Sequence, residues 1–226
     1  MQNDPNVNAT SVRTESALAT NKVLRNTYML LSLTLIFSAL TAGFAMITNA
    51  PPLNIWLVLA GFLGLPILVQ VTRKSSLGLV STFLFTGFVG YATGPILNAY
   101  LTTFSNGAEL ITMALGSTGL IFLGLSAIAM NPSRDFSHWG RFLTVGIAVA
   151  FIAMIANVFF FKLPGMYLAV SVLFSLISGG LILFQTNMII KGGETNYISA
   201  TLTLYISIYN IFMTLLQIFG LGGNRN

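Results

Sequence analysis

Seven stretches of apolar residues, each long enough to cross a lipid bilayer, constrain this chain more than any other feature of its sequence. A hydrocarbon core about 30 Å thick needs roughly 20 helical residues to span it. The stretches of about that length are 27–48, 53–71, 77–99, 108–130, 140–161, 165–189 and 197–220. The sequence therefore predicts an all-α, polytopic membrane protein with seven transmembrane helices.

Composition supports a single membrane domain. Charged residues make up 7% of the 226 positions and hydrophobic residues 55%, whereas soluble domains carry about 25% charged residues. Residues 27–220 are expected to form the seven-helix domain, 1–26 a polar cytoplasmic tail and 221–226 a short C-terminal tail. The connections between the apolar stretches are too short to hold a soluble domain, and the first stretch is too long for a signal peptide.

The distribution of Lys and Arg predicts the orientation. Cytoplasmic loops of membrane proteins are enriched in these residues. If the N-terminus lies in the cytoplasm, the same side also holds Arg13, Lys22, Arg25, Arg73, Lys74, Arg134, Arg141 and Lys191, and the other side only Lys162 and Arg225. We therefore expect a multi-pass protein of a bacterial inner membrane with a cytoplasmic N-terminus and a periplasmic C-terminus. Because the basic residues are dispersed at the ends of the spans, they do not indicate nucleic-acid binding.

The chemistry available inside the membrane is limited. The chain has no Cys and one His, His138, so a site built from thiolates or several histidines is excluded. The five acidic residues lie in tails, in loops or at the ends of spans: Asp4, Glu15, Glu109, Asp135 and Glu194. Proton relays and metal sites within membranes usually depend on buried ionisable groups. We therefore expect no enzymatic activity, no metal and no cofactor.

A row of polar residues on the last two spans is the clearest intramembrane feature. Residues spaced by three and four lie on one face of a helix, and this spacing relates Thr203, Ser207, Asn210, Thr214 and Gln217 in the last span. The preceding span offers a matching row of Ser171, Ser175, Ser178 and Gln185. Polar side chains in hydrocarbon must face other helices or water. We call these nine residues the polar seam and favour helix–helix contact over an ion path as its role.

Gly94 and Pro95 lie within an otherwise apolar stretch. Proline removes a helical hydrogen bond, so this pair predicts a helix break or kink. Gly90 and Gly94 also match the GxxxG pattern, which allows helices to approach each other closely.

Four segments of the sequence resemble the YccA-type, proteobacterial branch of the Bax-inhibitor (TMBIM) family. These segments are NKVLRNTY (21–28), TGFVGYATGPILN (86–98), GGETNYI (192–198) and LYISIYNIF (204–212). The third segment contains the loop motif Gly192, Gly193 and Glu194. The resemblance implies a fold in which six helices surround a central seventh. It also implies that the protein binds the membrane-anchored ATP-dependent protease FtsH, and its HflKC partners, and restrains proteolysis as a poor substrate.

The resemblance also implies an alternative function, because other family members are pH-sensitive calcium leak channels. In those proteins two acidic residues share a proton and latch to an arginine. The corresponding positions here are Gln185 and Ser207, with the arginine near Arg73. A Gln–Ser pair does not titrate near neutral pH, although the two side chains can form a hydrogen bond. This departure from the family pattern disfavours a pH-gated calcium or proton leak and favours modulation of the protease.

Overall fold

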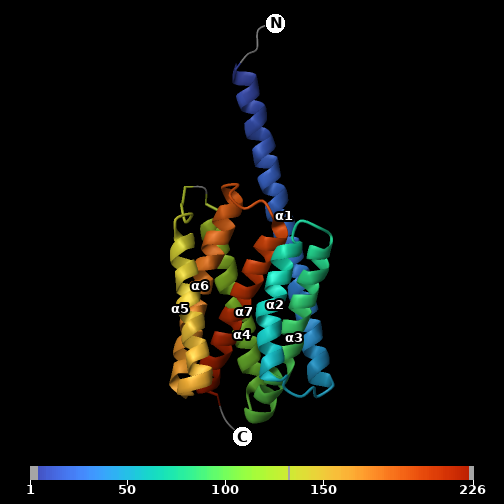
Figure 1. Cartoon of the computed structure of the whole chain (residues 1–226), viewed down its shortest axis with the longest axis vertical. Helices are drawn as coiled ribbons and strands as arrows, with labels where there is room; N and C mark the ends of the chain where they lie inside the picture. Colours follow the sequence, from blue (N-terminus) through green and yellow to red (C-terminus); the bar gives the residue numbers. More distant parts are fainter. Residues whose placement is uncertain (1–4, 132, 224–226) are drawn as a thin grey trace.

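A computed structural model describes residues 5–131 and 133–223, and these residues form a bundle of long helices (Figure 1). The elements are α1 (Pro5–Ile47), α2 (Ile55–Thr72), α3 (Leu77–Thr103), α4 (Gly107–Ala129), α5 (Trp139–Ala156), η1 (Asn157–Phe161), α6 (Pro164–Ile190) and α7 (Tyr197–Leu221). The short η1 is a π-helical turn that continues α5. Seven helices are long and apolar enough to cross a membrane, which confirms the predicted seven-helix membrane fold.

Helix α1 is much longer than its predicted span. It runs for 43 residues, whereas its apolar part covers Lys22–Ile47. The first turns extend past the ends of the other helices (Figure 1). The N-terminal tail expected before residue 27 is therefore, from Pro5 on, a helix continuous with the first span. We call the end of the bundle from which it projects the N-terminal face, and the opposite end the C-terminal face.

Helix α7 lies at the centre of the bundle. Half of its most apolar 18-residue window is buried within the protein, as is half of that of α3, against 17% for α4 and for α5 with η1. It packs against α1, α2, α3, α4 and α6, and α5 in turn packs on α6. The central seventh helix that the resemblance implies is therefore present, with five helices packed directly against it and α5 forming an outer layer beside α6.

Helices α1 and α3 pack closely through glycine. A Cβ atom added at Gly90 would overlap the backbone carbonyl of Ser38, and one added at Gly94 would lie 2.5 Å from the Cβ of Ala45. Helix α3 continues through Gly94 and Pro95 without interruption, so the break, one of the two predicted outcomes at this pair, does not occur. A proline costs the helix one hydrogen bond, and the extensive contact with α1 and α2 holds α3 together across this position.

Candidate functional site

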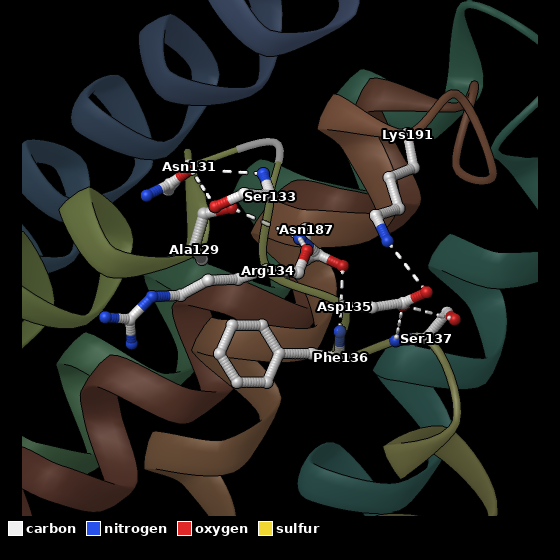
Figure 2. Close-up of polar contacts among 9 residues, drawn as sticks. All are labelled: Ala129, Asn131, Ser133, Arg134, Asp135, Phe136, Ser137, Asn187 and Lys191. Carbon is white, nitrogen blue, oxygen red and sulfur yellow. Dashed lines mark hydrogen bonds and ion pairs between the residues drawn. The ribbon is translucent and has the colours of Figure 1, made fainter.

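Asn187, near the end of α6, holds the connection between α4 and α5 against the N-terminal face (Figure 2). Its side chain is fully buried. Its amide nitrogen donates to the carbonyl oxygens of Ala129, at 3.3 Å, and Arg134, at 3.0 Å. Its amide oxygen accepts from the backbone N–H of Phe136 at 3.1 Å. One side chain thus satisfies three backbone groups of residues 129–136, a segment we call the 129–136 loop.

An ion pair also ties this loop to the end of α6. The ammonium of Lys191 lies 2.8 Å from a carboxylate oxygen of Asp135. The hydrogen bond from Lys191, with further bonds from Ser137, holds the pKa of Asp135 far below its usual range. Both side chains are partly exposed to solvent, and an exposed ion pair contributes little to stability. We therefore assign most of the attachment of the loop to Asn187.

A second asparagine fixes the neighbouring connection between α2 and α3. The side-chain oxygen of Asn196 caps α7 by accepting from Ile198 and Ser199, each at 3.0 Å. Its amide nitrogen donates to the backbone carbonyl of Arg73 at 2.9 Å. The guanidinium of Arg73 in turn donates to Gln70 and Ser199, each at 3.2 Å. The N-terminal face is therefore held together by side-chain amides that bind the backbone of two loops.

The predicted loop motif forms the turn from α6 into α7. Gly192 has a φ of 73°, which favours glycine because other side chains rarely adopt this conformation. The backbone N–H groups of Gly193 and Glu194 both donate to the carbonyl of Met188, at 2.8 and 3.1 Å. The carboxylate of Glu194 accepts from the N–H of Asn196 at 2.8 Å. The motif thus ends α6 and positions the capping asparagine of α7.

Ser207 and Arg73, two of the three proposed latch residues, bond to separate partners. The Ser207 hydroxyl donates to the carbonyl of Thr203 at 2.8 Å, and Arg73 binds the first turn of α7 through Ser199. The hydrogen bond that Gln185 and Ser207 could form is not among those found between the described residues. Serine in a helix commonly bonds to the carbonyl four residues earlier, which accounts for the orientation of Ser207. Gln185 is 6% exposed, so it is part of the packed interior.

The polar seam joins α6 and α7 at two points. The amide of Asn210 donates to the hydroxyl of Ser178 at 3.1 Å. The hydroxyl of Thr214 donates to the backbone carbonyl of Ser171 at 2.8 Å and to the carbonyl of Asn210 at the same distance. Thr203 bonds within its own helix, and Ser175 and Gln217 are half-buried. The bonds from Asn210 to Ser178 and from Thr214 to Ser171 are therefore contacts between the two helices.

Sequence reasoning missed the polar contacts on the opposite side of α7. The hydroxyls of Tyr205 and Ser38 are 2.6 Å apart, and Tyr205 donates to the carbonyl of Thr86 at 3.3 Å. Thr201 donates to the carbonyl of Thr27 at 3.2 Å. Helix α7 is thus bonded to α1 and α3 as well as to α6. The spacing of Thr201 and Tyr205, four residues apart, could have indicated a second polar face of this helix. It was overlooked because a tyrosine in an apolar span looks like an ordinary residue of the apolar core.

Taken together, the fold and these contacts define a multi-pass membrane protein whose polar side chains bind its own helices and loops. Within residues 5–131 and 133–223, no group of three or more His, Cys, Asp or Glu side chains could hold a metal ion.

The chain belongs to the Bax-inhibitor family. A family model described as inhibitor of apoptosis-promoting Bax1 matches residues 20–225. The chain is 50% identical over 205 residues to a protein of Escherichia coli K12 named modulator of FtsH protease YccA, covering 91% of this chain and 92% of that protein. A second Escherichia coli relative, with the same identity and coverage, is named inner membrane protein YccA. An uncharacterized membrane protein of Vibrio cholerae is 42% identical over 213 residues, or 94% of this chain and 95% of that one.

Proposed function

We propose that this protein is a non-enzymatic modulator of the membrane-anchored protease FtsH, which it binds and restrains in a bacterial inner membrane. The observation that carries this proposal is the 50% identity, over 91% of the chain, to a relative named for that function. HflKC is the expected further partner. The orientation that places the N-terminal face in the cytoplasm is part of the proposal and rests on the distribution of Lys and Arg.

The structure suggests how such a protein restrains a protease. Helix α1 continues from Pro5 into the membrane without a break, so a pull on the projecting end is transmitted directly to the bundle. Inside the bundle α1 is held by its glycine-mediated contact with α3 and by the bond between Ser38 and Tyr205. A protease that engages this end therefore has to extract a helix packed against both α3 and α7. Slow extraction would occupy the protease and delay the degradation of other substrates.

The firmly bonded N-terminal face supports the same mechanism. A protease that unfolds its substrates starts from segments that open easily. The 129–136 loop and the residues around Arg73 are each attached by a buried or half-buried asparagine. On this face, unfolding by the protease is therefore expected to start at the projecting end of α1 and not at these loops.

A pull-down from detergent extracts tests the proposal. The full chain carrying a C-terminal tag should recover FtsH, and a variant lacking residues 1–20 should recover less of it. A matched control that replaces residues 1–20 with another helical, polar sequence of equal length shows whether the segment itself is recognised. Failure of the full chain to recover the protease would refute the proposal.

The alternative of a calcium or proton leak is not favoured. Gln185 and Ser207 carry no titratable group, and the hydroxyl of Ser207 donates within its own helix. A flux of calcium into dye-loaded liposomes that Ser207→Leu abolishes would revive this alternative.

A further inference from the structure

A groove lies between α1 and α4, and the contacts above do not explain it. It encloses about 470 Å³ and has walls formed by α1 and α4 and a floor formed by α3 and α7. Leu35, Ala39 and Gly43 line one wall, and Leu115, Gly119 and Phe122 line the other. Ala39, Leu115 and Gly119 are exposed on the outside of the bundle. The groove is therefore open sideways, toward the surroundings of the membrane-spanning helices.

The floor of the groove presents hydroxyl groups that already have partners. Tyr205 and Ser38 bond to each other. Thr93 donates to the carbonyl of Val89 at 2.7 Å and lies 3.4 Å from the hydroxyl of Tyr209. These hydroxyls are bonded within the protein, and neither of the two described residues with a buried, unpartnered side-chain oxygen, Thr27 and Ser126, lines the groove. Apolar cavities remain dry, and an unfilled one forfeits dispersion contacts. A hydrocarbon occupant therefore fits the lining best.

The length and position of the groove select the kind of occupant. Its lining runs from Leu35 to Met46 on α1 and from Ile111 to Phe122 on α4. At 1.5 Å per helical residue, the groove is therefore about 17 Å long. That is about half of a hydrocarbon core of about 30 Å, which corresponds to one leaflet. Met46 is one residue from the end of α1, and Ile111 lies in the second turn of α4. The groove thus extends from the C-terminal face to near the middle of the bundle.

The inner end of the groove is blocked. The ring of Phe122 lies 5.8 Å from that of Tyr28, and the Tyr28 hydroxyl is 3.4 Å from that of Thr186, so α1, α4 and α6 meet there. A transmembrane helix of a partner spans the whole bilayer and could not lie in a groove that ends halfway. A flexible chain that stops near the midplane can.

We propose that this groove binds one acyl chain of a phospholipid from the leaflet at the C-terminal face. The headgroup would lie near the ends of α1 and α3, where the amide of Asn98 donates to Asn49 at 3.1 Å. A bound chain would fill the space between α1 and α4 and pack over the Tyr205–Ser38 contact. This inference does not depend on the proposed function.

The test uses the full chain in vesicles of phosphatidylethanolamine and phosphatidylglycerol. A small fraction of the phosphatidylglycerol carries a photoreactive diazirine in the middle of one acyl chain, and mass spectrometry locates the adducts. Leu115, in the groove, is 57% exposed, and Phe142, on the outer surface of α5, is 76% exposed. If the groove holds an acyl chain, we expect more lipid adduct at Leu115 than at Phe142. Adduct yields that simply follow exposure would overturn the proposal.

Two glycines of α4 provide a matched pair of variants. Neither Gly119, in the groove, nor Gly116, outside it, has an atom within 4 Å of an added Cβ. Gly119→Phe fills the groove and should abolish the excess labelling at Leu115, whereas Gly116→Phe should leave it unchanged. Circular dichroism and gel filtration verify that both variants fold. If Gly119→Phe does not fold, the comparison of Leu115 with Phe142 in the unaltered protein decides.

Discussion

Removing the side chain of Asn187 should release the 129–136 loop from the N-terminal face. Asn187→Ala deletes three hydrogen bonds between one buried amide and the backbone of that loop. At a net contribution of about 1 kcal/mol per bond, local attachment weakens by about 3 kcal/mol. Because 1.4 kcal/mol corresponds to a factor of ten, the population of the detached loop rises about 100-fold.

Limited trypsin digestion measures this population directly, because Arg134 lies within the loop. When opening and closing are fast relative to cleavage, the cleavage rate follows the population of the open state. We therefore expect Asn187→Ala to raise the rate of cleavage after Arg134 by about 100-fold in detergent, as determined by mass spectrometry of the fragments. The full chain with an intact Asn187 supplies the reference rate.

Asn157 offers a matched control at the opposite end of the bundle. It is also buried, and its side chain holds the turn before α6 through two bonds with the backbone of Leu163, at 3.3 and 3.0 Å. Asn157→Ala should therefore leave cleavage at Arg134 unchanged. If Asn187→Ala is cleaved there no faster than the unaltered chain, the account of the N-terminal face as held by side-chain amides is incorrect.

Three further perturbations test other parts of the structure. Lys191→Met should raise the pKa of Asp135 toward the ordinary value of about 3.9, which a carbon-detected NMR titration can follow. Since the ion pair lowers the pKa of Asp135 in the folded state, the stability it contributes is present above the ordinary pKa and is lost as the pH falls toward the folded-state pKa. An unchanged titration would contradict the ion pair. Tyr205→Phe removes bonds to α1 and α3 and should destabilise the bundle by roughly 1–2 kcal/mol in an SDS titration, a wild-type midpoint being the contrary result. The side chain of Gly90→Leu overlaps the backbone of α1 and should lower the stability of the bundle by roughly 1–3 kcal/mol in the same assay. Gly116→Leu, whose side chain meets open space, should leave the stability unchanged. Equal effects of the two variants would argue against close packing of α1 on α3.

The number of spans could be predicted from the sequence because it depends only on the lengths of apolar stretches. The packing of Gly90 and Gly94 was also visible, since their spacing places both on one face of a helix. The effect of Pro95 on α3 could not be predicted, because the contacts of α3 with its neighbours decide whether the helix breaks at the proline. The continuation of α1 as far as Pro5 was missed for a similar reason, since a polar segment shows no apolar periodicity.

The contacts that attach the loops were beyond sequence reasoning for a different reason. Asn187 and Asn196 look like polar residues at the ends of spans, and their partners are backbone groups 51 to 123 residues away along the chain. Only the fold brings these groups together. A general rule could have indicated Asn187, because an amide in the last turn of an apolar helix needs a partner. The bond of Ser207 to its own helix shows the limit of transferring a family pattern to a position whose residue has changed.

The rate at which FtsH degrades a reporter substrate tests the central claim most directly. Protease and reporter are reconstituted in vesicles with the full chain, and in parallel with the chain lacking residues 1–20. The account predicts that the full chain co-purifies with the protease and slows degradation of the reporter in proportion to its amount, and that the shortened chain slows it less. Degradation at the same rate with and without the full chain, when both proteins are folded in one membrane, would contradict the account.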